Sequence, residues 1–382
     1  MSFSSKLGAR FKLRTYYIRQ WPRHYNACMP RFRVLYDGWP LIHQPNHAQS
    51  IHLRTLLALA PEETESVLAL PMENDHGIGQ LAETVELLSV QEDDAGTWKQ
   101  KQLPRLAEQY GAQIIHTSSR SASLFGRVNT IISPADFGSQ ESGEYSLRSR
   151  LGQSLGRGGL ARAHILWPSD LPKSQLPGTQ LSLDPVVHPA FIEANADPPA
   201  HLDLPETYIL YHGPTDPPSM LKLLESWTWA ASSIGEYFPL LILGLEEKDR
   251  NFVKARLPEF HVEDYVKLLP ALPFEDLIAV YQHCSALAHL APPSAWGGPI
   301  RHALASAKPV VASNDPSSEA LVGPAAYLVP PDDLRAFGAA LISVVVDEKV
   351  TEKLEEAARK RASNWNKKKF TEELLSVYGK IL

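Results

Sequence analysis

The sequence predicts an α/β protein built from two doubly wound, parallel-sheet domains that face each other across a cleft. Three observations support this prediction. Short apolar strands alternate with amphipathic helices along the chain, which is typical of parallel βαβ units. The 382 residues exceed one ordinary core and suit two domains of about 150–200 residues. A polar, proline-rich stretch without periodicity, Glu193–Pro205, separates two alternating series.

The first series reads as four strands and three helices. The expected strands are Phe32–Ile42 (a strand that runs into a turn), Ser66–Leu70, Ala112–Ser119 and Asn129–Asp136, and the expected helices are Leu53–Ala60, Glu83–Val90 and Leu103–Tyr110. All four strands are apolar runs, as in sheets that are covered on both faces.

The second series repeats this alternation. Strands are expected at Thr207–Gly213, Pro239–Gly244, Tyr265–Pro270, Ser285–Pro292 and Pro309–Ala312, and helices at Met220–Ala231, Phe274–His283, Ile300–Ala305, Leu334–Val345 and around Phe370–Ile381. The predicted boundaries are residues 1–32 for a basic extension, 33–196 for the first domain, 197–206 for the linker, 207–366 for the second domain and 367–382 for a final helix. Ligands of such sheets bind at the carboxyl ends of the strands, here in the cleft.

Composition excludes several classes of protein. The net charge of −6 argues against a nucleic-acid binder, and no apolar run is long enough to predict a transmembrane helix. Cys28 and Cys284 are the only cysteines, which indicates a reducing, cytoplasmic setting and no disulfide framework. The histidines lack metal-ligand spacing, so no catalytic metal is expected. The absence of a Gly-x-Ser-x-Gly elbow argues against a hydrolase.

The first 36 residues are basic and contain no acidic side chain. Their eight cations are Lys6, Arg10, Lys12, Arg14, Arg19, Arg23, Arg31 and Arg33. Three interpretations stay open: an amphipathic helix on an anionic membrane surface, an organelle transit peptide, or an arm folded onto the acidic body. Under the first, the protein is peripheral to a membrane and residues 1–33 make the contact.

The chain resembles the family 4 glycosyltransferases, which have the GT-B fold of two Rossmann-like domains. The likeness is clearest in "YILYHGPTDPPSMLKLLES", "FEDLIAVYQHCSALAHLAP" and "GGPIRHALASAKPVVASNDPSSEALVGPAAYLVPPDD". It is looser in the first half, through "RVLYDGWPLI" and "ARAHILWPSDL". The resemblance implies that the first domain is the acceptor side and the second the donor side. It also implies that the last helix, "WNKKKFTEELLSVYGKIL", crosses back to the first domain.

Members of this family transfer a sugar from a nucleotide sugar with retention and without a metal, so cationic groups and helix N-termini must stabilise the leaving diphosphate. The family's Glu-x7-Glu pair falls on Ser294 and His302, and its Arg-Lys pair on Pro218 and Ser219. Further departures are Ala48 and Ser50 near the first-domain Gly-rich turn and Ala135 in place of a His, although Asp136 remains on the acceptor side; the matching positions are Gly213, Gly244, Gly297, Pro309 and Glu319. The contact residues are therefore replaced where the backbone pattern is kept.

Candidate donor-binding residues remain at Gly213, Gly297, Gly298, Arg301, His302 and Glu319. The Gly pair either presents backbone N–H groups to a phosphate or carboxylate, or forms a plain turn. Arg301 and His302 either form a new donor site or are an exposed helix pair without a ligand. His212 and Lys222 either replace the missing cations or have no such role. "GQSLGRGG" (Gly152–Gly159) lacks the ending of a phosphate loop and is discounted.

Three functional hypotheses follow. The first is a glycosyltransferase homologue with little or no activity that serves as a binding or partner subunit, for example of an active transferase. The second is an active retaining hexosyltransferase that uses a nucleotide sugar as donor substrate and no cofactor. The third is a membrane-surface scaffold that works through the basic arm. The altered donor positions favour the first.

Overall fold

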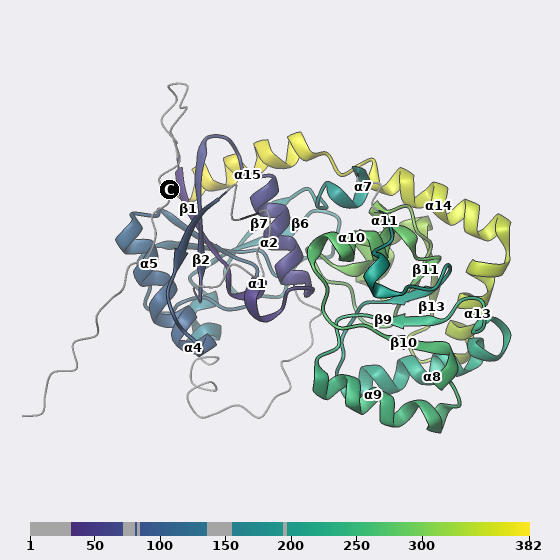
Figure 1. The fold of residues 1–382 in the computed structure, drawn as a ribbon. Helices are drawn as coiled ribbons and strands as arrows, with labels where there is room; N and C mark the ends of the chain where they lie inside the picture. Colours follow the sequence, from purple (N-terminus) through teal and green to yellow (C-terminus); the bar gives the residue numbers. More distant parts are fainter. Residues whose placement is uncertain (1–31, 72–80, 82–84, 136–154, 194–196) are drawn as a thin grey trace, which may run out of the picture.

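The computed structural model describes residues 32–71, 81, 85–135, 155–193 and 197–382. These residues form two parallel-sheet α/β domains, as predicted (Figure 1). None of the helices in this part of the chain combines the length and apolarity needed to cross a membrane.

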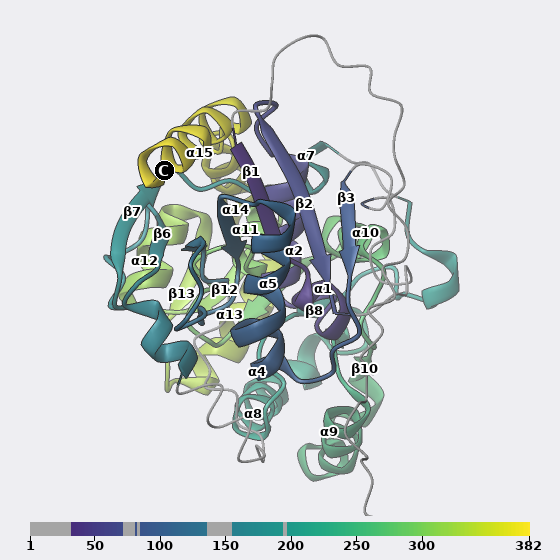
Figure 2. The same cartoon turned by 90° about the vertical axis from the view of Figure 1, so that its left-hand side faces the viewer.

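The N-terminal domain contains a seven-stranded sheet in the order β3-β2-β1-β4-β5-β6-β7, and every pair is parallel. The strands are β1 (Phe32–Asp37), β2 (Thr64–Leu70), β3 (Glu86–Ser89), β4 (Ile114–Thr117), β5 (Asn129–Ile132), β6 (His164–Pro168) and β7 (Thr179–Leu183). Alternate residues of a strand point to opposite faces of the sheet. Val34 therefore packs on the face covered by α2 (Ala48–Ala58). Leu35 packs on the other face, which is covered by a continuous helical segment made of α4 (Ala95–Thr97), a π-helical turn (Trp98–Gln102) and α5 (Leu103–Tyr110). Figure 2 shows α2 and α5 on the two faces of this sheet.

The C-terminal domain contains a six-stranded parallel sheet in the order β10-β9-β8-β11-β12-β13. Its strands are β8 (Ile209–Tyr211), β9 (Leu240–Ile242), β10 (Val266–Leu268), β11 (Ala286–His289), β12 (Val310–Ser313) and β13 (Ala326–Val329). One face packs on α8 (Pro217–Ile234), α9 (Glu247–Phe260) and α13 (Leu334–Val346), and the other on α10 (Phe274–His283), α11 (Pro299–Ala305) and α12 (Pro316–Val322). Both faces are covered, which explains the continuous apolar strands.

Two long helices complete the chain and run along both domains, drawn in yellow in Figure 1. α14 (Glu348–Ala362) packs on the C-terminal domain through Ala358. α15 (Lys367–Ile381) instead places Phe370, Leu374 and Tyr378 in the core of the N-terminal domain. The chain thus returns to the domain in which it began.

One element was predicted wrongly. The expected helix at Glu83–Val90 is an edge strand where it is described, because Leu87 and Leu88 pair with Leu68 and Ala69 of β2. A short apolar run in the sequence fits a helix as well as a strand. This segment forms a strand because it pairs with the edge of β2. Strands β6 and β7 were not predicted as strands. Figure 1 also labels two short helices, α1 (Trp39–His43) and α7 (Ala190–Glu193).

Candidate functional site between the domains

The loop between β11 and α11 lies directly against the N-terminal domain. Gly297 has φ +61°, and a Cβ atom there would lie 2.5 Å from the backbone oxygen of Ala48 at the start of α2. Gly298 caps α11, and its Cβ would lie 2.9 Å from the Cβ of Ser294. Both positions therefore need glycine: the first for its dihedral angle and its contact with α2, the second for the tightness of the loop.

Trp296 of this loop is fully buried in the other domain's core. Its indole N–H donates a hydrogen bond of 3.0 Å to the backbone oxygen of Leu166 in β6. The indole stacks on the imidazole of His52 at 5.1 Å and meets Phe370 of α15 edge-on at 6.4 Å. The loop thus places a large side chain from the C-terminal domain between α2, β6 and α15 of the N-terminal domain.

Ser294, at a position where the resemblance places a glutamate, belongs to the same loop. It is 1% exposed, and its hydroxyl donates a hydrogen bond of 2.6 Å to the backbone oxygen of Trp296. The side chain therefore shapes the turn that carries the indole.

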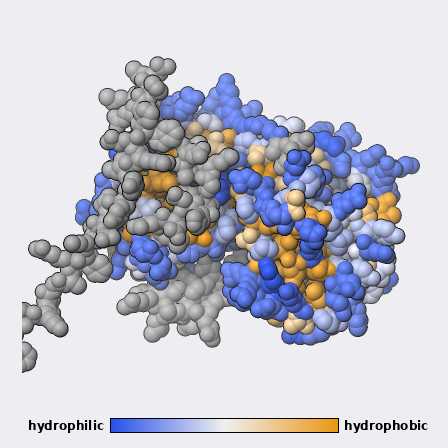
Figure 3. Space-filling model, in the orientation of Figure 1, coloured by the Kyte–Doolittle hydropathy of each residue, from blue (hydrophilic) through white to orange (hydrophobic). Residues whose placement is uncertain are grey.

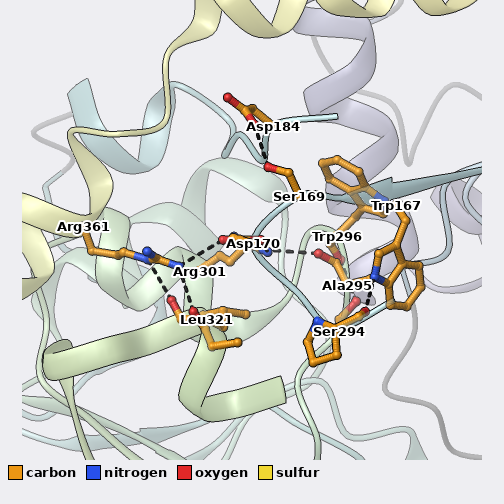
Figure 4. Close-up of polar contacts among 12 residues, drawn as sticks. Trp167, Ser169, Asp170, Asp184, Ser294, Ala295, Trp296, Arg301, Leu321 and Arg361 are labelled. Atoms are coloured by element: carbon orange, nitrogen blue, oxygen red, sulfur yellow. Dashed lines mark hydrogen bonds and ion pairs between the residues drawn. The ribbon is translucent and has the colours of Figure 1, made fainter. Parts of the chain in front are cut away.

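Arg301 forms an ion pair across the two domains (Figure 4). Its guanidinium is completely buried and donates two hydrogen bonds, of 3.0 and 2.8 Å, to the carboxylate of Asp170 after β6. Arg361 of α14 donates to the same carboxylate at 3.2 Å, and its other N–H groups donate to the backbone oxygens of Ala320 and Leu321. One carboxylate thus holds two guanidinium groups in a largely buried cluster, the Asp170 clasp (Asp170, Arg301 and Arg361).

His302 is also buried and lies among aromatic rings. It is 1% exposed, stacks on Phe191 at 4.3 Å with an interplanar angle of 12°, and meets Tyr281 edge-on at 5.5 Å. The expectation of an exposed helix pair at Arg301 and His302 was therefore wrong. All of α11 is buried, because it packs between the sheet and the neighbouring domain, and the two polar residues of this short helix did not reveal this in the sequence.

A chain of hydrogen bonds crosses the N-terminal core next to Trp296. His52 and His116 each lie 2.9 Å from the hydroxyl of Ser133 through Nε2. His116 Nδ1 lies 2.8 Å from the hydroxyl of Tyr378, which lies 3.0 Å from that of Tyr36. The chain connects α2, β4, α15 and β1, so five polar side chains share one buried network.

The remaining predicted positions are more scattered. Gly213 follows β8, where a Cβ would lie 2.8 Å from the Tyr211 hydroxyl. Its neighbour His212 is buried and bonds to the Tyr281 hydroxyl at 2.7 Å. Lys222 is exposed and lies 3.7 Å from Asp332, and Glu319 is exposed on α12. Asp136 lies outside the described residues.

The glycine-rich stretch "GQSLGRGG" is described from residue 155 on, where it is helical. A Cβ atom at Gly159 would lie 2.2 Å from the backbone oxygen of Ala122, and one at Gly156 would lie 2.9 Å from the Cβ of Ser121. These glycines permit close packing on the loop after β4.

Burial controls the charge state of the histidines between the domains. It lowers the pKa of His212 to about 3 and the pKa of His188 to about 4, with a further effect of His47 on the first and of Arg54 on the second. The pKa values of His52 and His302 lie well below the ordinary value, again because of burial first and then because of neighbouring imidazoles and Arg301. These four imidazoles are therefore neutral at pH 7.

The chemistry of the arrangement follows from what these side chains already bind. Arg301, the cation nearest to the donor-side loop, is neutralised by Asp170. The hydroxyl of Ser294 bonds to the backbone of its own loop, and the ring of His302 stacks on Phe191. A cavity of about 10 Å³, lined by residues such as Asp37, Lys99 and Ser121, lies within the N-terminal domain and has room for about one water.

Sequence reasoning missed Asp170, Trp296, His52 and Arg361. The only available signals were an aspartate after an apolar strand in "HILWPSDL" and a tryptophan next to the Gly pair in "SAWGG". Neither signal identifies its partner, which lies more than a hundred residues away.

Two facing domains of this topology define the GT-B class of fold, and solved structures agree. Sucrose-phosphate synthase (tll1590) from Thermosynechococcus elongatus matches with a TM-score of 0.71 at 18% identity, over 92% of this chain and 99% of that one. WaaG, a glycosyltransferase involved in lipopolysaccharide biosynthesis, matches with 0.68 at 13%, over 90% and 99%. Anabaena Alr3699/HepE in complex with UDP and glucose matches with 0.64 at 15%, over 91% and 100%. Because the sequence identities are only 13–18%, this structural similarity establishes the fold alone.

The sequence comparison adds a family signal within the C-terminal domain. Residues 222–361 match the family described as glycosyl transferases group 1. A search of curated protein sequences finds no match. The matched segment contains the loop, α11 and Arg361, and therefore most of the C-terminal side of the domain contact.

Proposed function

We propose that this protein is a family 4 glycosyltransferase homologue with little or no catalytic activity, which serves as a binding or partner subunit. The burial of Trp296 in the N-terminal core carries the proposal. A nucleotide sugar would have to lie between the domains, at the carboxyl ends of the strands. That is where the loop of this chain contacts α2 and inserts its indole.

Three of the replaced positions support the proposal because their side chains have a structural use. The hydroxyl of Ser294 holds the turn at Trp296, and the ring of His302 stacks on Phe191. Ser219, where a cation is expected, donates two hydrogen bonds to the capping carboxylate of Asp216 at the start of α8, from its backbone N–H and from its hydroxyl. A leaving diphosphate without cationic support would lose several kcal/mol of transition-state stabilisation, on the order of 10²–10³ in rate for each missing donor.

The alternative is an active retaining transferase with a nucleotide-sugar donor. The match of residues 222–361 favours it, as does the left-handed backbone of Gly297, with φ +61°. One structural relative is described in complex with UDP and glucose. In this alternative the domains separate, Arg301 leaves Asp170 for a phosphate, and His302 contacts the donor.

The deciding experiment is a thermal-shift panel of UDP, ADP, GDP and the corresponding nucleotide sugars, followed by an assay of sugar-nucleotide consumption. A ligand at about 100 times its Kd adds about 2.7 kcal/mol to stability and raises Tm by a few degrees. The proposal predicts no shift and no consumption. A shift with one base, together with consumption that His302→Gln abolishes, would replace it by the active transferase.

A role as a partner subunit requires a surface to which a second protein can bind. α8 exposes Leu221 and Trp229, with exposed fractions of 37% and 51%, and Tyr237 just beyond it is 71% exposed. The face drawn in Figure 3 also shows apolar residues on the C-terminal domain between hydrophilic ones. Gel filtration of native extract tests this role: a complex larger than the monomer is expected, and a lone monomer would contradict it.

A further inference from the structure

Four histidines meet where the two domains touch. His52 lies on α2, His188 lies between β7 and α7, His212 follows β8 and His302 lies on α11. His52, His212 and His302 are 1%, 4% and 1% exposed, and His188 is partly buried. The other three all act electrostatically on His302, so the four form one imidazole cluster.

Aromatic rings, rather than carboxylates, surround these imidazoles. His302 lies between Phe191 and Tyr281, and its Nδ1 is buried without a hydrogen-bond partner among the described residues. The ring of His188 meets Phe274 edge-on at 4.8 Å. His52 stacks on Trp296, and its Nδ1 likewise finds no partner in the described part of the chain.

Both cations and carboxylates lie around the cluster. Arg301 acts on His302 and His52, Arg54 and Lys367 act on His188, and the further imidazoles His47, His289 and His116 face His212 and His52. Three of the nearby carboxylates have cationic neighbours, and the fourth faces an imidazole. They are Asp170 with Arg301 and Arg361, Glu193 with Lys367, Glu275 near Arg54, and Asp315, which acts on His289. Among the described groups that act on His302, none is acidic, so a proton added there meets the cation Arg301 and other imidazoles but no carboxylate.

We propose that the imidazole cluster is an acid-sensitive latch, whose protonation separates the two domains while each domain keeps its own sheet. The inference is independent of the proposed function, because it holds for an inactive and for an active protein alike. Histidine suits this role since its ordinary pKa lies just below neutral pH.

The sign of the effect follows from linkage. The pKa of His212 is lowered to about 3 and that of His188 to about 4 in the closed form, mainly by burial. Separation hydrates the rings and restores values near about 6.5, so the separated form binds more protons. Closure is therefore fully favoured above about pH 6.5 and weakens as the pH falls towards about 4. At pH 5 each such histidine favours separation about 30-fold.

Separation is expected before unfolding because each domain has cores of its own. The sheets of the two domains are hydrogen-bonded separately, and most of the residues in each major cluster come from one domain. The contact between them depends on fewer groups than the domain cores. It includes Trp296, the Asp170 clasp, the imidazole cluster, the hydrogen bonds between Asn46 and Leu272, and the apolar residues Ile51, Val187 and Phe191, which pack in the core of the C-terminal domain. Contacts between domains of one chain are generally weaker than the domains themselves.

The experiment is size-exclusion-coupled small-angle scattering of the full chain from pH 7.5 to pH 5, with far-UV circular dichroism of the same samples. The radius of gyration is expected to rise between pH 6.5 and pH 5 while the dichroism stays constant. A constant radius down to pH 5 would overturn the proposal. So would a rise that coincides with loss of dichroism, because that outcome is global unfolding.

Two variants test the histidines themselves. His302→Phe keeps a ring between Phe191 and Tyr281 but removes one proton site, so the separation constant at pH 5 should fall, by up to about 30-fold. His212→Gln keeps an acceptor for the Tyr281 hydroxyl and should act in the same direction, which covers the case that the first variant does not fold. His283→Gln, on the exposed end of α10, is the matched control and should leave the transition unchanged. Equal transitions in all three variants would refute the latch.

Discussion

The indole N–H of Trp296 donates a hydrogen bond to the backbone oxygen of Leu166, so a side chain of the C-terminal domain completes the core of the N-terminal domain. The donor is on the loop before α11 and the acceptor is in β6, 130 residues earlier in the chain. In the GT-B fold this is the place where two domains face each other. Here the two domains touch through Trp296, which contacts Leu166 and His52.

Removing the indole should destabilise the whole protein. Trp296→Ala is expected to lower the free energy of unfolding by about 3–5 kcal/mol, because it leaves a cavity between α2, β6 and α15. Thermal and urea denaturation measure the loss. Trp229→Ala is the control, since that indole is 51% exposed and contacts Arg335, and it should change stability by about 1 kcal/mol or less. Equal losses in both variants would contradict the role assigned to Trp296.

The Asp170 clasp should behave as a buried ion pair. Asp170→Asn leaves the completely buried Arg301 without its countercharge and should cost about 3–5 kcal/mol of unfolding free energy. Adding Arg301→Met should recover part of this loss, because the unpaired charge is removed. Asp184→Asn is the matched control, because the Asp184 carboxylate pairs with the exposed Lys369 and should contribute at most about 1 kcal/mol. A double variant less stable than Asp170→Asn would argue against charge burial as the cause.

The two tyrosines of the buried hydrogen-bond chain, Tyr36 and Tyr378, should differ in how much their hydroxyls contribute to stability. Tyr378→Phe leaves Nδ1 of His116 without a partner in the core and should cost about 1–3 kcal/mol. Tyr36→Phe removes only the hydrogen bond at the end of the chain, between the hydroxyls of Tyr36 and Tyr378. The Tyr378 hydroxyl still bonds to His116, so the free energy of unfolding should fall by only about 0.5–1.5 kcal/mol. Urea titration of both variants compares them. A larger loss in Tyr36→Phe would mean that the order of the chain is different.

His116 gives a prediction for the pH dependence of stability. Burial lowers the pKa of this imidazole to about 3, so its contribution is complete above about pH 6.5 and is lost as the pH falls towards about 3. At pH 5 the loss is about 2 kcal/mol for this group. In His116→Gln the dependence of unfolding free energy on pH should weaken by up to about 1.4 kcal/mol per pH unit between pH 6.5 and pH 5. An unchanged slope would show that other groups control this range.

Gly297 can be tested against a glycine of similar dihedral angle. Gly297→Ala combines φ +61° with a Cβ 2.5 Å from the backbone oxygen of Ala48, whereas a Cβ at Gly244, with φ +83°, meets nothing within 4 Å. Gly244→Ala should therefore cost only the strain of about 1–2 kcal/mol, and Gly297→Ala distinctly more. Comparable Tm values for the two variants would mean that the loop moves away from α2 without loss.

The sequence by itself determined the α/β class, the two parallel sheets and most strands of both domains, because apolar runs that are buried on both faces are a local signal. It did not determine β3, since "ELLS" becomes a strand only by pairing with β2. The candidate residues Ser294, Arg301 and His302 could be selected from the sequence, but their burial could not. That burial depends on Asp170, Phe191 and Trp296, which meet only when the two domains pack together. Tertiary structure alone decided these contacts between the domains, because they join residues more than a hundred positions apart.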